Sequence, residues 1–167
     1  MNLVFHTVFS ISTSPIFVKK IVETDKFFKY LSLSFLSNIF MHGVMDLVPH
    51  NYPVKTIIDV GISFIFFLLS IIFIRSKLLT PAFLCFLGGI LPDLIDKGVF
   101  QILRMNNLKL FPWHWADVIN FFYKWYFAYT WLFVTFNILA IVVSMCLLLV
   151  NRKFIIQNML KFTGHPK

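Results

Sequence analysis

Long uninterrupted apolar runs dominate this sequence and leave few ways to fold it. Four of them, at approximately 30–47, 56–74, 78–96 and 126–150, approach the roughly 20 helical residues that cross a bilayer. They are continuously apolar, without the alternation expected of strands in a membrane β-barrel. The mean hydropathy is +0.82, and a soluble domain of this size could not bury so much apolar surface. The sequence therefore predicts an all-α fold, a polytopic transmembrane helix bundle that forms a single integral membrane domain over residues 1–167.

The N-terminal segment, residues 1–18, is only moderately apolar, and the sequence leaves its role open. Small polar residues and a proline interrupt its apolar run: Ser10, Ser12, Thr13, Ser14 and Pro15. A secretory signal would place cations before its apolar core, whereas Lys19 and Lys20 follow this one. We therefore expect residues 1–18 to form a fifth span, a re-entrant segment or an interfacial helix.

The cations of the chain are distributed unequally about the four runs. The net charge is +8, and ten of the 15 Lys and Arg residues fall on one side of the predicted bundle: Lys19, Lys20, Lys26, Lys29, Arg75, Lys77, Arg152, Lys153, Lys161 and Lys167. The positive-inside rule places that side, with the C-terminus, in the cytoplasm. We expect a plasma-membrane or inner-membrane protein whose partners are membrane lipids and a further protein or copies of itself. Because the cations are explained by topology, no nucleic-acid partner is expected.

The connection between the third and fourth runs, residues 97–125, is long and rich in aromatic side chains. These are Phe111, Trp113, Trp115, Phe121, Phe122, Tyr123 and Trp125. Trp and Tyr are enriched where a membrane meets water. The sequence therefore predicts an interfacial helix or lid that lies over the non-cytoplasmic end of the bundle.

Ionisable side chains gather at that same non-cytoplasmic end. The set holds five of the seven carboxylates and three of the five histidines: His42, Asp46, His50, Asp59, Asp93, Asp96, His114 and Asp117. Ionisable groups at a membrane boundary are costly, and they usually pair with one another or mark a functional site. If residues 1–18 span the membrane, His6 joins the same side.

The first motif in this set is the stretch from His42 to His50. His42 and Asp46 are four residues apart and share one helix face. Pro49 disfavours helix at the preceding residue, so His50 should follow in a turn that can fold back. Two imidazoles and a carboxylate this close together can form half of a metal site, although Asp46 and His50 could also simply solvate a helix end.

The second motif contains Asp93 and Asp96, which are three residues apart behind Pro92. Proline breaks the regular helix and frees backbone groups near the two carboxylates. Asp93 is a predicted metal ligand. Asp96 is a predicted catalytic base or further ligand, with an interfacial ion pair to Lys97 as the alternative.

The third motif places His114 between two tryptophans, with Asp117 three residues later. His114 is a predicted acid or base, or a further ligand, and could instead be an aromatic-belt residue. Asp117 could orient His114 or begin the following helix. Asp59, one turn into the second run, could be a helix-dipole charge.

Three sequence stretches together carry a resemblance to a known family. "FMHGVMDLVPH", "GGILPDLID" and "FPWHW" resemble the motifs of small polytopic membrane-bound metal-dependent hydrolases. The resemblance covers roughly residues 31–115. It implies a set of candidate site residues: His42, Asp46, His50, Asp93, Asp96 and His114.

Two functions are consistent with this pattern. The first is a metal-dependent hydrolase with His42, Asp46, His50 and Asp93 as metal ligands. Mixed imidazole and carboxylate ligands favour Zn²⁺, with Mn²⁺ or Fe as alternatives. At this depth the substrate would be a lipid or lipid-linked molecule, in particular a phosphoester. The second is a non-catalytic membrane subunit that uses the cluster for a structural metal, for ion or proton handling, or for partner docking.

Overall fold

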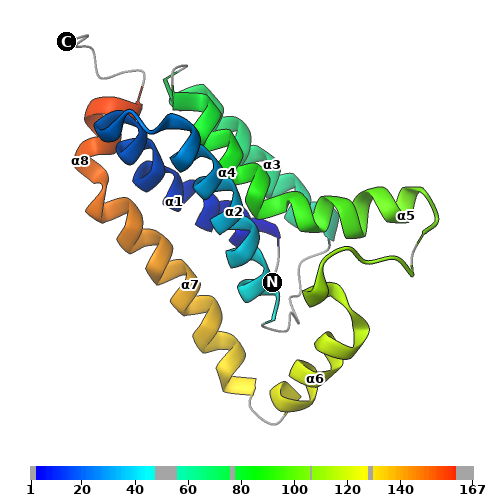
Figure 1. Ribbon diagram of the computed structural model, residues 1–167. Helices are drawn as coiled ribbons and strands as arrows, with labels where there is room; N and C mark the ends of the chain where they lie inside the picture. The colour runs from blue at the N-terminus through cyan, green and yellow to red at the C-terminus, as the bar shows by residue number, and fades with distance from the viewer. Residues whose placement is uncertain (1–2, 48–55, 76–77, 106, 128–129, 161–167) are drawn as a thin grey trace.

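The computed structural model describes most of the chain: residues 3–47, 56–75, 78–105, 107–127 and 130–160. The described residues are almost entirely helical and form no strand, apart from one isolated bridge between Ile74 and Leu160. This confirms the all-α prediction. Figure 1 shows that the helices within residues 3–93 lie side by side, that the chain then leads outward, and that the helix of residues 130–150 returns to contact the N-terminal helix.

Helices occupy the first two apolar runs and the N-terminal segment. Helix α1 spans Leu3–Thr24, α2 spans Phe27–Asp46 and α3 spans Thr56–Phe73. Helices α1 and α2 are antiparallel because a turn of two residues joins them. The start of α1 therefore lies beside the end of α2 (Figure 1).

The third run forms one continuous helical stretch with a change of winding. Helix α4 spans Leu79–Asp93, a π-helical turn η2 covers Leu94–Val99, and α5 adds Phe100–Ile102. Pro92 lies just before η2, where its missing N–H interrupts the regular hydrogen-bond ladder. The stretch therefore continues beyond the predicted end of the run and carries the first part of the 97–125 connection.

The rest of the connection and the fourth run complete the fold. A short 3₁₀ turn η3 (Pro112–His114) precedes α6 (Ala116–Phe127), and α7 follows at Thr130–Val150. Beyond α7, α8 (Arg152–Phe154) and the π-helical turn η4 (Ile155–Met159) close the described chain. The predicted helix in the aromatic connection is therefore present as α6.

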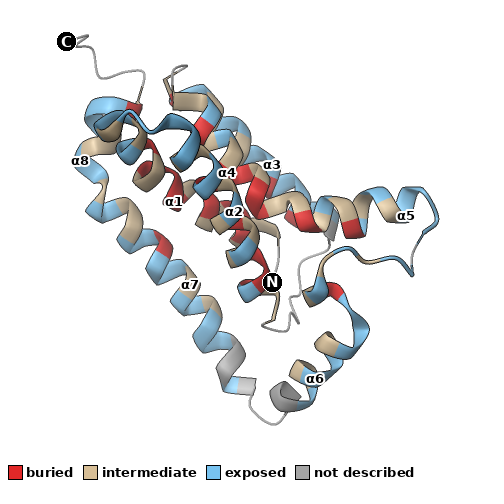
Figure 2. Ribbon diagram, in the orientation of Figure 1, coloured by how far each residue is buried: buried red, intermediate tan, exposed pale blue. Residues whose placement is uncertain are grey.

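Helix α1 lies at the centre, in contact with α2, α3, α4 and α7. Figure 2 shows its buried face, which carries His6 and five small polar residues: Thr7, Ser10, Ser12, Thr13 and Ser14. Small residues at helix interfaces let backbones approach closely. The residues that interrupt the apolar run of α1 are therefore those that pack it against its neighbours.

Pro15 is accommodated inside α1 by the residue before it. A proline cannot donate to the carbonyl four residues earlier, here that of Ile11. The hydroxyl of Ser14 donates a hydrogen bond of 2.9 Å to this carbonyl oxygen. The polar side chain thus satisfies the backbone group that the proline leaves free.

Among the described residues, the stretch Leu79–Ile102 alone is an unbent helix long and apolar enough to cross a membrane. Val134–Val150 and Arg152–Met159 would make a second crossing if they count as one span, although they meet at 59°. Ile57–Phe73 is apolar but shorter. The bundle of four or five spans therefore stays a prediction.

Close packing of α2 against α4 depends on Gly88. A Cβ atom at this position would meet the backbone oxygen of Phe35, whereas one at Gly61 would meet nothing within 4 Å. We expect Gly88→Ala to lower the free energy of unfolding by about 1–3 kcal/mol, because the backbone must shift. The matched Gly61→Ala should be neutral or stabilise by up to about 1 kcal/mol through helix propensity. Thermal unfolding in detergent measures both, and equal shifts would contradict the close approach.

Candidate metal centre

Three helix ends that are distant in the sequence meet at one end of the bundle. His6 lies in the second turn of α1, His42 and Asp46 in the last turns of α2, and Asp93 at the end of α4. One ligand atom from each of these four residues lies within 4.8 Å of the others. The group could hold a metal ion.

Asp46 is the common partner of the imidazoles in this group. Its Oδ1 lies 3.0 Å from Nε2 of His6, and its Oδ2 lies 3.1 Å from Nε2 of His42. The rings of His6 and His42 stack with their centroids 3.9 Å apart. Both residues are buried, so this end of the bundle holds two imidazoles and a carboxylate away from solvent.

A backbone hydrogen bond fixes the tautomer of His42. Its Nδ1 lies 2.6 Å from the carbonyl oxygen of Gly89, which can only accept, so Nδ1 carries a hydrogen. In the neutral ring Nε2 then carries a lone pair. This atom faces two carboxylate oxygens, Oδ2 of Asp46 at 3.1 Å and Oδ1 of Asp93 at 3.6 Å. A lone pair that faces two carboxylate oxygens needs a cation between them, either a proton or a metal ion.

Some of the distances among these donors are close to those around a bound metal ion, although the four ligand atoms are only as close as 4.8 Å when one atom is taken from each residue. Zinc–ligand bonds of 2.0–2.2 Å in tetrahedral geometry place neighbouring donor atoms about 3.4 Å apart. The donor separations between His6, His42, Asp46 and Asp93 include 3.0, 3.1 and 3.6 Å. The second nitrogen of His6, Nδ1, is buried without a hydrogen-bond partner. Two imidazoles and two carboxylates are a donor set that suits Zn²⁺, Mn²⁺ or Fe²⁺.

His114 reaches the same carboxylates from the connection. Its Nε2 lies 2.8 Å from Oδ2 of Asp46 and 3.2 Å from Oδ1 of Asp93. Its Nδ1 lies 2.8 Å from Oδ2 of Asp96. The structure thus brings His114 to the site that the sequence predicted.

Asp96 is fully buried and fastens the connection to the helix. Its two carboxylate oxygens accept hydrogen bonds from the backbone N–H groups of Leu110 and Phe111, at 2.9 and 3.1 Å, as well as from His114. The ammonium of Lys109 donates to the backbone oxygen of Asp96. The π-helical turn η2 aims this carboxylate at the connection, and Asp96 in turn sets the position of His114.

The surrounding carboxylates stabilise the charged form of His114. Burial by itself would lower the pKa of His114, but hydrogen bonds to Asp46, Asp93 and Asp96 outweigh it and raise the pKa to about 9. Without a metal ion, His114 is therefore an imidazolium at neutral pH. The stabilisation of the fold by this charged ring is complete at pH values below 6.5, the ordinary pKa of histidine, and is lost as the pH rises through about 9.

Lys97 lies where the site meets the surface. Its Nζ is 2.6 Å from Oδ1 of Asp93 and 3.8 Å from Oδ2 of Asp46, and half of its side chain is exposed. The sequence suggested a pair with Asp96, but the spacing of four residues along the helix brings Lys97 to Asp93. A cation therefore lies at the mouth of the cluster.

The remaining predicted residues have different positions. Asp59 on α3 accepts hydrogen bonds of 2.8 and 3.1 Å from the backbone N–H groups of Leu3 and Val4. It therefore caps the N-terminus of α1, the helix of His6, in addition to lying in the first turn of its own helix. Asp117 is exposed in the first turn of α6, and His50 lies outside the described residues.

Comparison of the chain with models of protein families, with curated proteins and with solved structures finds no match.

The hydrogen bonds by which Asp96 holds the connection can be tested by replacing its carboxylate with an amide. In Asp96→Asn, one oxygen becomes an NH₂ group that cannot accept from the buried backbone donors. We expect the free energy of unfolding to fall by about 1–3 kcal/mol. The matched control Asp117→Asn, at an exposed carboxylate, should change it by no more than about 0.5 kcal/mol. Thermal unfolding of both variants measures the difference, and equal stabilities would show that Asp96 does not hold the connection.

Proposed function

We propose that this protein is a membrane-embedded, metal-dependent hydrolase that acts on a lipid or lipid-linked phosphoester at the non-cytoplasmic face. The observation that supports the proposal is the convergence of four donors, His6, His42, Asp46 and Asp93, beside His114. The motifs that resemble membrane-bound metal-dependent hydrolases contain most of these residues. His6 adds a donor to the predicted ligands His42, Asp46 and Asp93, and the predicted ligand His50 lies outside the described residues.

The proposal assigns binding of the ion to the two imidazoles and two carboxylates. When bound there, a divalent ion such as Zn²⁺ would acidify a water molecule and polarise a phosphoryl or ester oxygen. The fixed tautomer of His42 presents Nε2 to the ion, because the hydrogen on Nδ1 is held by the Gly89 carbonyl. The helix ends already hold the donors together, and binding of the ion would replace the contacts that Asp46 and Asp93 make with His114 and Lys97.

The proton-transfer role belongs to His114. Its ring lies against the carboxylates of the site and is held from behind by Asp96, so it can hold or move a proton at Nε2. Asp96 is then a positioning residue, since its oxygens already accept from His114 and from two backbone N–H groups. Lys97 at the mouth would attract an anionic group such as a phosphate.

The membrane setting is supported by the apolar surface of the outer helices. Many large apolar side chains of α3 and α7 are exposed, including Ile57, Phe64, Ile138 and Val150. Large exposed apolar faces of this kind are rare on soluble monomers. We propose that the four predicted runs and α1 cross the bilayer together, with the site at the non-cytoplasmic end.

A second candidate function follows from one observation. Lys97 and His114 already pair with Asp93 and Asp46, so two cations balance two carboxylates of the cluster without a metal ion. A non-catalytic membrane subunit could use such a balanced ionic cluster to hold its helix ends together. Metal content distinguishes the two candidates.

Elemental analysis of the detergent-purified protein tests the metal site. We expect a stoichiometric divalent metal in the parent and its loss in the His42→Ala/Asp93→Ala double variant, because two of four donors are gone. The control Asp117→Asn should keep the metal. A folded parent that takes up neither Zn²⁺ nor Mn²⁺ would rule out the hydrolase and favour the ionic cluster.

Hydrolysis of a lipid phosphate monoester, phosphatidic acid, tests the reaction. We expect His114→Gln to retain the bound metal but to reduce kcat by about 10²-fold or more, because the group that transfers the proton is lost. The rate of phosphate release in detergent micelles measures this effect. A metal-loaded His114→Gln protein with the activity of the parent would show that His114 is not the acid or base.

A further inference from the structure

Lys97 contacts the carboxylate oxygens that a metal ion at this site would take. Its Nζ lies 2.6 Å from Oδ1 of Asp93 and 3.8 Å from Oδ2 of Asp46. Nε2 of His42 faces the same two oxygens, at 3.6 and 3.1 Å. An ammonium and a divalent ion cannot both lie among these oxygens, because their positive charges would repel each other at very short range. Binding of the ion therefore requires the ammonium to leave.

His114, the second cation at these carboxylates, is held more firmly than Lys97. Its Nε2 lies 2.8 Å from Oδ2 of Asp46, and its Nδ1 is hydrogen-bonded to the fully buried carboxylate of Asp96. Asp96 therefore retains the ring next to the site when an ion replaces its contact with Asp46. Lys97 instead reaches the carboxylates with a flexible stem, and 51% of its side chain is exposed. Of the two cations, Lys97 is the one that can move out toward solvent.

Displacement of Lys97 changes the net charge at the mouth of the site. Without an ion, the two cations Lys97 and His114 offset two carboxylates of the cluster. A divalent ion offsets the same two carboxylates by itself, so the ammonium of Lys97 becomes a surplus positive charge. A free ammonium beside a bound metal ion is a place where an anion binds, and the oxygens of a phosphate group can contact both.

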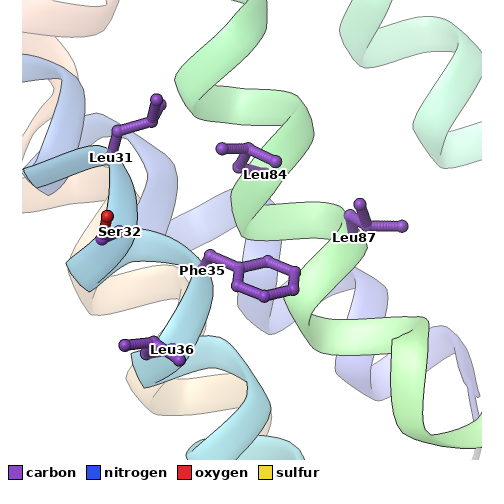
Figure 3. A pocket seen from close by; sticks show the side chains of 6 residues that line it. All are labelled: Leu31, Ser32, Phe35, Leu36, Leu84 and Leu87. Carbon is purple, nitrogen blue, oxygen red and sulfur yellow. The ribbon is translucent and has the colours of Figure 1, made fainter. Parts of the chain in front are cut away.

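This place for an anion is separate from the open apolar groove between α2 and α4. Figure 3 shows the side chains that line the groove, all of them uncharged: Leu31, Ser32, Phe35, Leu36, Leu84 and Leu87. The ring of Trp113 covers α2 at Gly43, between this groove and the donors. A phosphate group therefore finds charged partners at the mouth of the cluster and not in the groove.

We infer that Lys97 couples the two ligands of the site: it pairs with the carboxylates until a divalent ion displaces it, and it then binds the phosphate group of the substrate. The inference rests on the proposed function and deepens it, because it gives an order of binding, the ion first and the phosphate second. By linkage, bound phosphate must raise the affinity for the ion by the factor by which the ion raises the affinity for phosphate. A lipid headgroup and free phosphate share this chemistry.

Acetylation of the lysine amines follows the displacement of Lys97 directly. The detergent-purified, full-length protein reacts briefly with acetic anhydride, and mass spectrometry measures the acetylation of each lysine. We expect saturating Zn²⁺ to raise the acetylation rate of Lys97 several-fold, because its amine leaves the ion pair, and inorganic phosphate to lower this rate again. Lys124, an exposed lysine on α6, is the internal reference and should not change. An unchanged rate at Lys97 in a protein that has bound Zn²⁺ would overturn the inference.

Calorimetric titration with inorganic phosphate measures the coupling itself. Zn²⁺-loaded protein, freed of excess metal, should bind phosphate about 5- to 150-fold more tightly than metal-free protein, the usual range of coupling between two ligands. A phosphonate analogue of phosphatidic acid distinguishes the two sources of the phosphate group. Tighter binding of this lipid than of inorganic phosphate would assign the site to a lipid headgroup, and equal binding would assign it to free phosphate. Equal affinities of loaded and metal-free protein for both ligands would overturn the inference.

The variant Lys97→Met separates this coupling from a general effect of charge. Methionine keeps an unbranched stem but cannot pair with a carboxylate or a phosphate. We expect opposite changes: tighter binding of Zn²⁺, because its competitor is gone, and weaker binding of phosphate by the loaded protein. Lys124→Met removes the same charge from the exposed surface of α6 and should alter neither affinity. Weaker binding of both ligands by folded Lys97→Met would show a structural role and overturn the inference.

Two further controls make the result decisive. If Lys97→Met does not fold, Lys97→Gln replaces it, and the acetylation of the parent protein is informative in either case. Elemental analysis of the same samples separates the two proposals. Bound Zn²⁺ with unchanged acetylation of Lys97 would overturn the coupling alone, whereas a folded parent that takes up no ion would overturn the metal-dependent function as well.

Discussion

The buried carboxylate of Asp46 holds imidazoles from three separate segments of the chain within hydrogen-bonding distance. Removing a carboxylate from water is costly unless cations and donors surround it. His6 brings the start of α1, His42 belongs to α2, and His114 brings the connection. The positions of these elements relative to one another at this end of the bundle thus depend on one side chain. A metal ion would strengthen the same arrangement, because it binds the folded helix ends together.

Helix α1, at the centre of the bundle, carries His6 to this site. Its buried face is polar. The hydroxyl groups of Ser12, Thr13 and Ser14 donate to backbone oxygens of the same helix, whereas those of Thr7 and Ser10 are buried without a hydrogen-bond partner among the described residues. This local pairing lets a polar helix lie inside an apolar bundle without needing partners on every neighbour. Asp59 on α3 caps the first turn of α1 and so fixes the depth of His6.

Hydrophobic patterning was enough to predict helices in the four apolar runs, and the course of those helices predicted a common end for eight ionisable residues, of which His50 lies outside the described residues. His42, Asp46, Asp93 and His114 were predicted from spacing and residue type, and the structure brings them together. The contribution of His6 was conditional, because Ser10 to Pro15 made α1 look like a weak span. Polar residues lower the hydropathy of a segment whether they face water or a close helix contact, so the sequence cannot separate these cases.

The partners of Asp96 were beyond sequence reasoning for a different reason. The direction of its side chain is set by the winding of η2, which is wider than an α-helix, and no periodicity in the sequence signals such a turn. The pairing of Asp96 with Leu110 and Phe111 also joins residues that only the path of the connection brings together.

The π-helical turn η2 has a consequence for how this chain can change by insertion and deletion. A turn of this kind holds one residue more than an α-helical turn, so removal of a single residue between Leu94 and Val99 would restore regular winding. The helix on both sides of the turn, Asp93 included, would keep its direction, because the wider turn is where the extra residue is taken up. A residue inside the turn, such as Asp96, would instead change its angle about the helix axis and leave the N–H groups of Leu110 and Phe111. One residue of chain length within this turn therefore decides whether the anchor of the connection points at the connection.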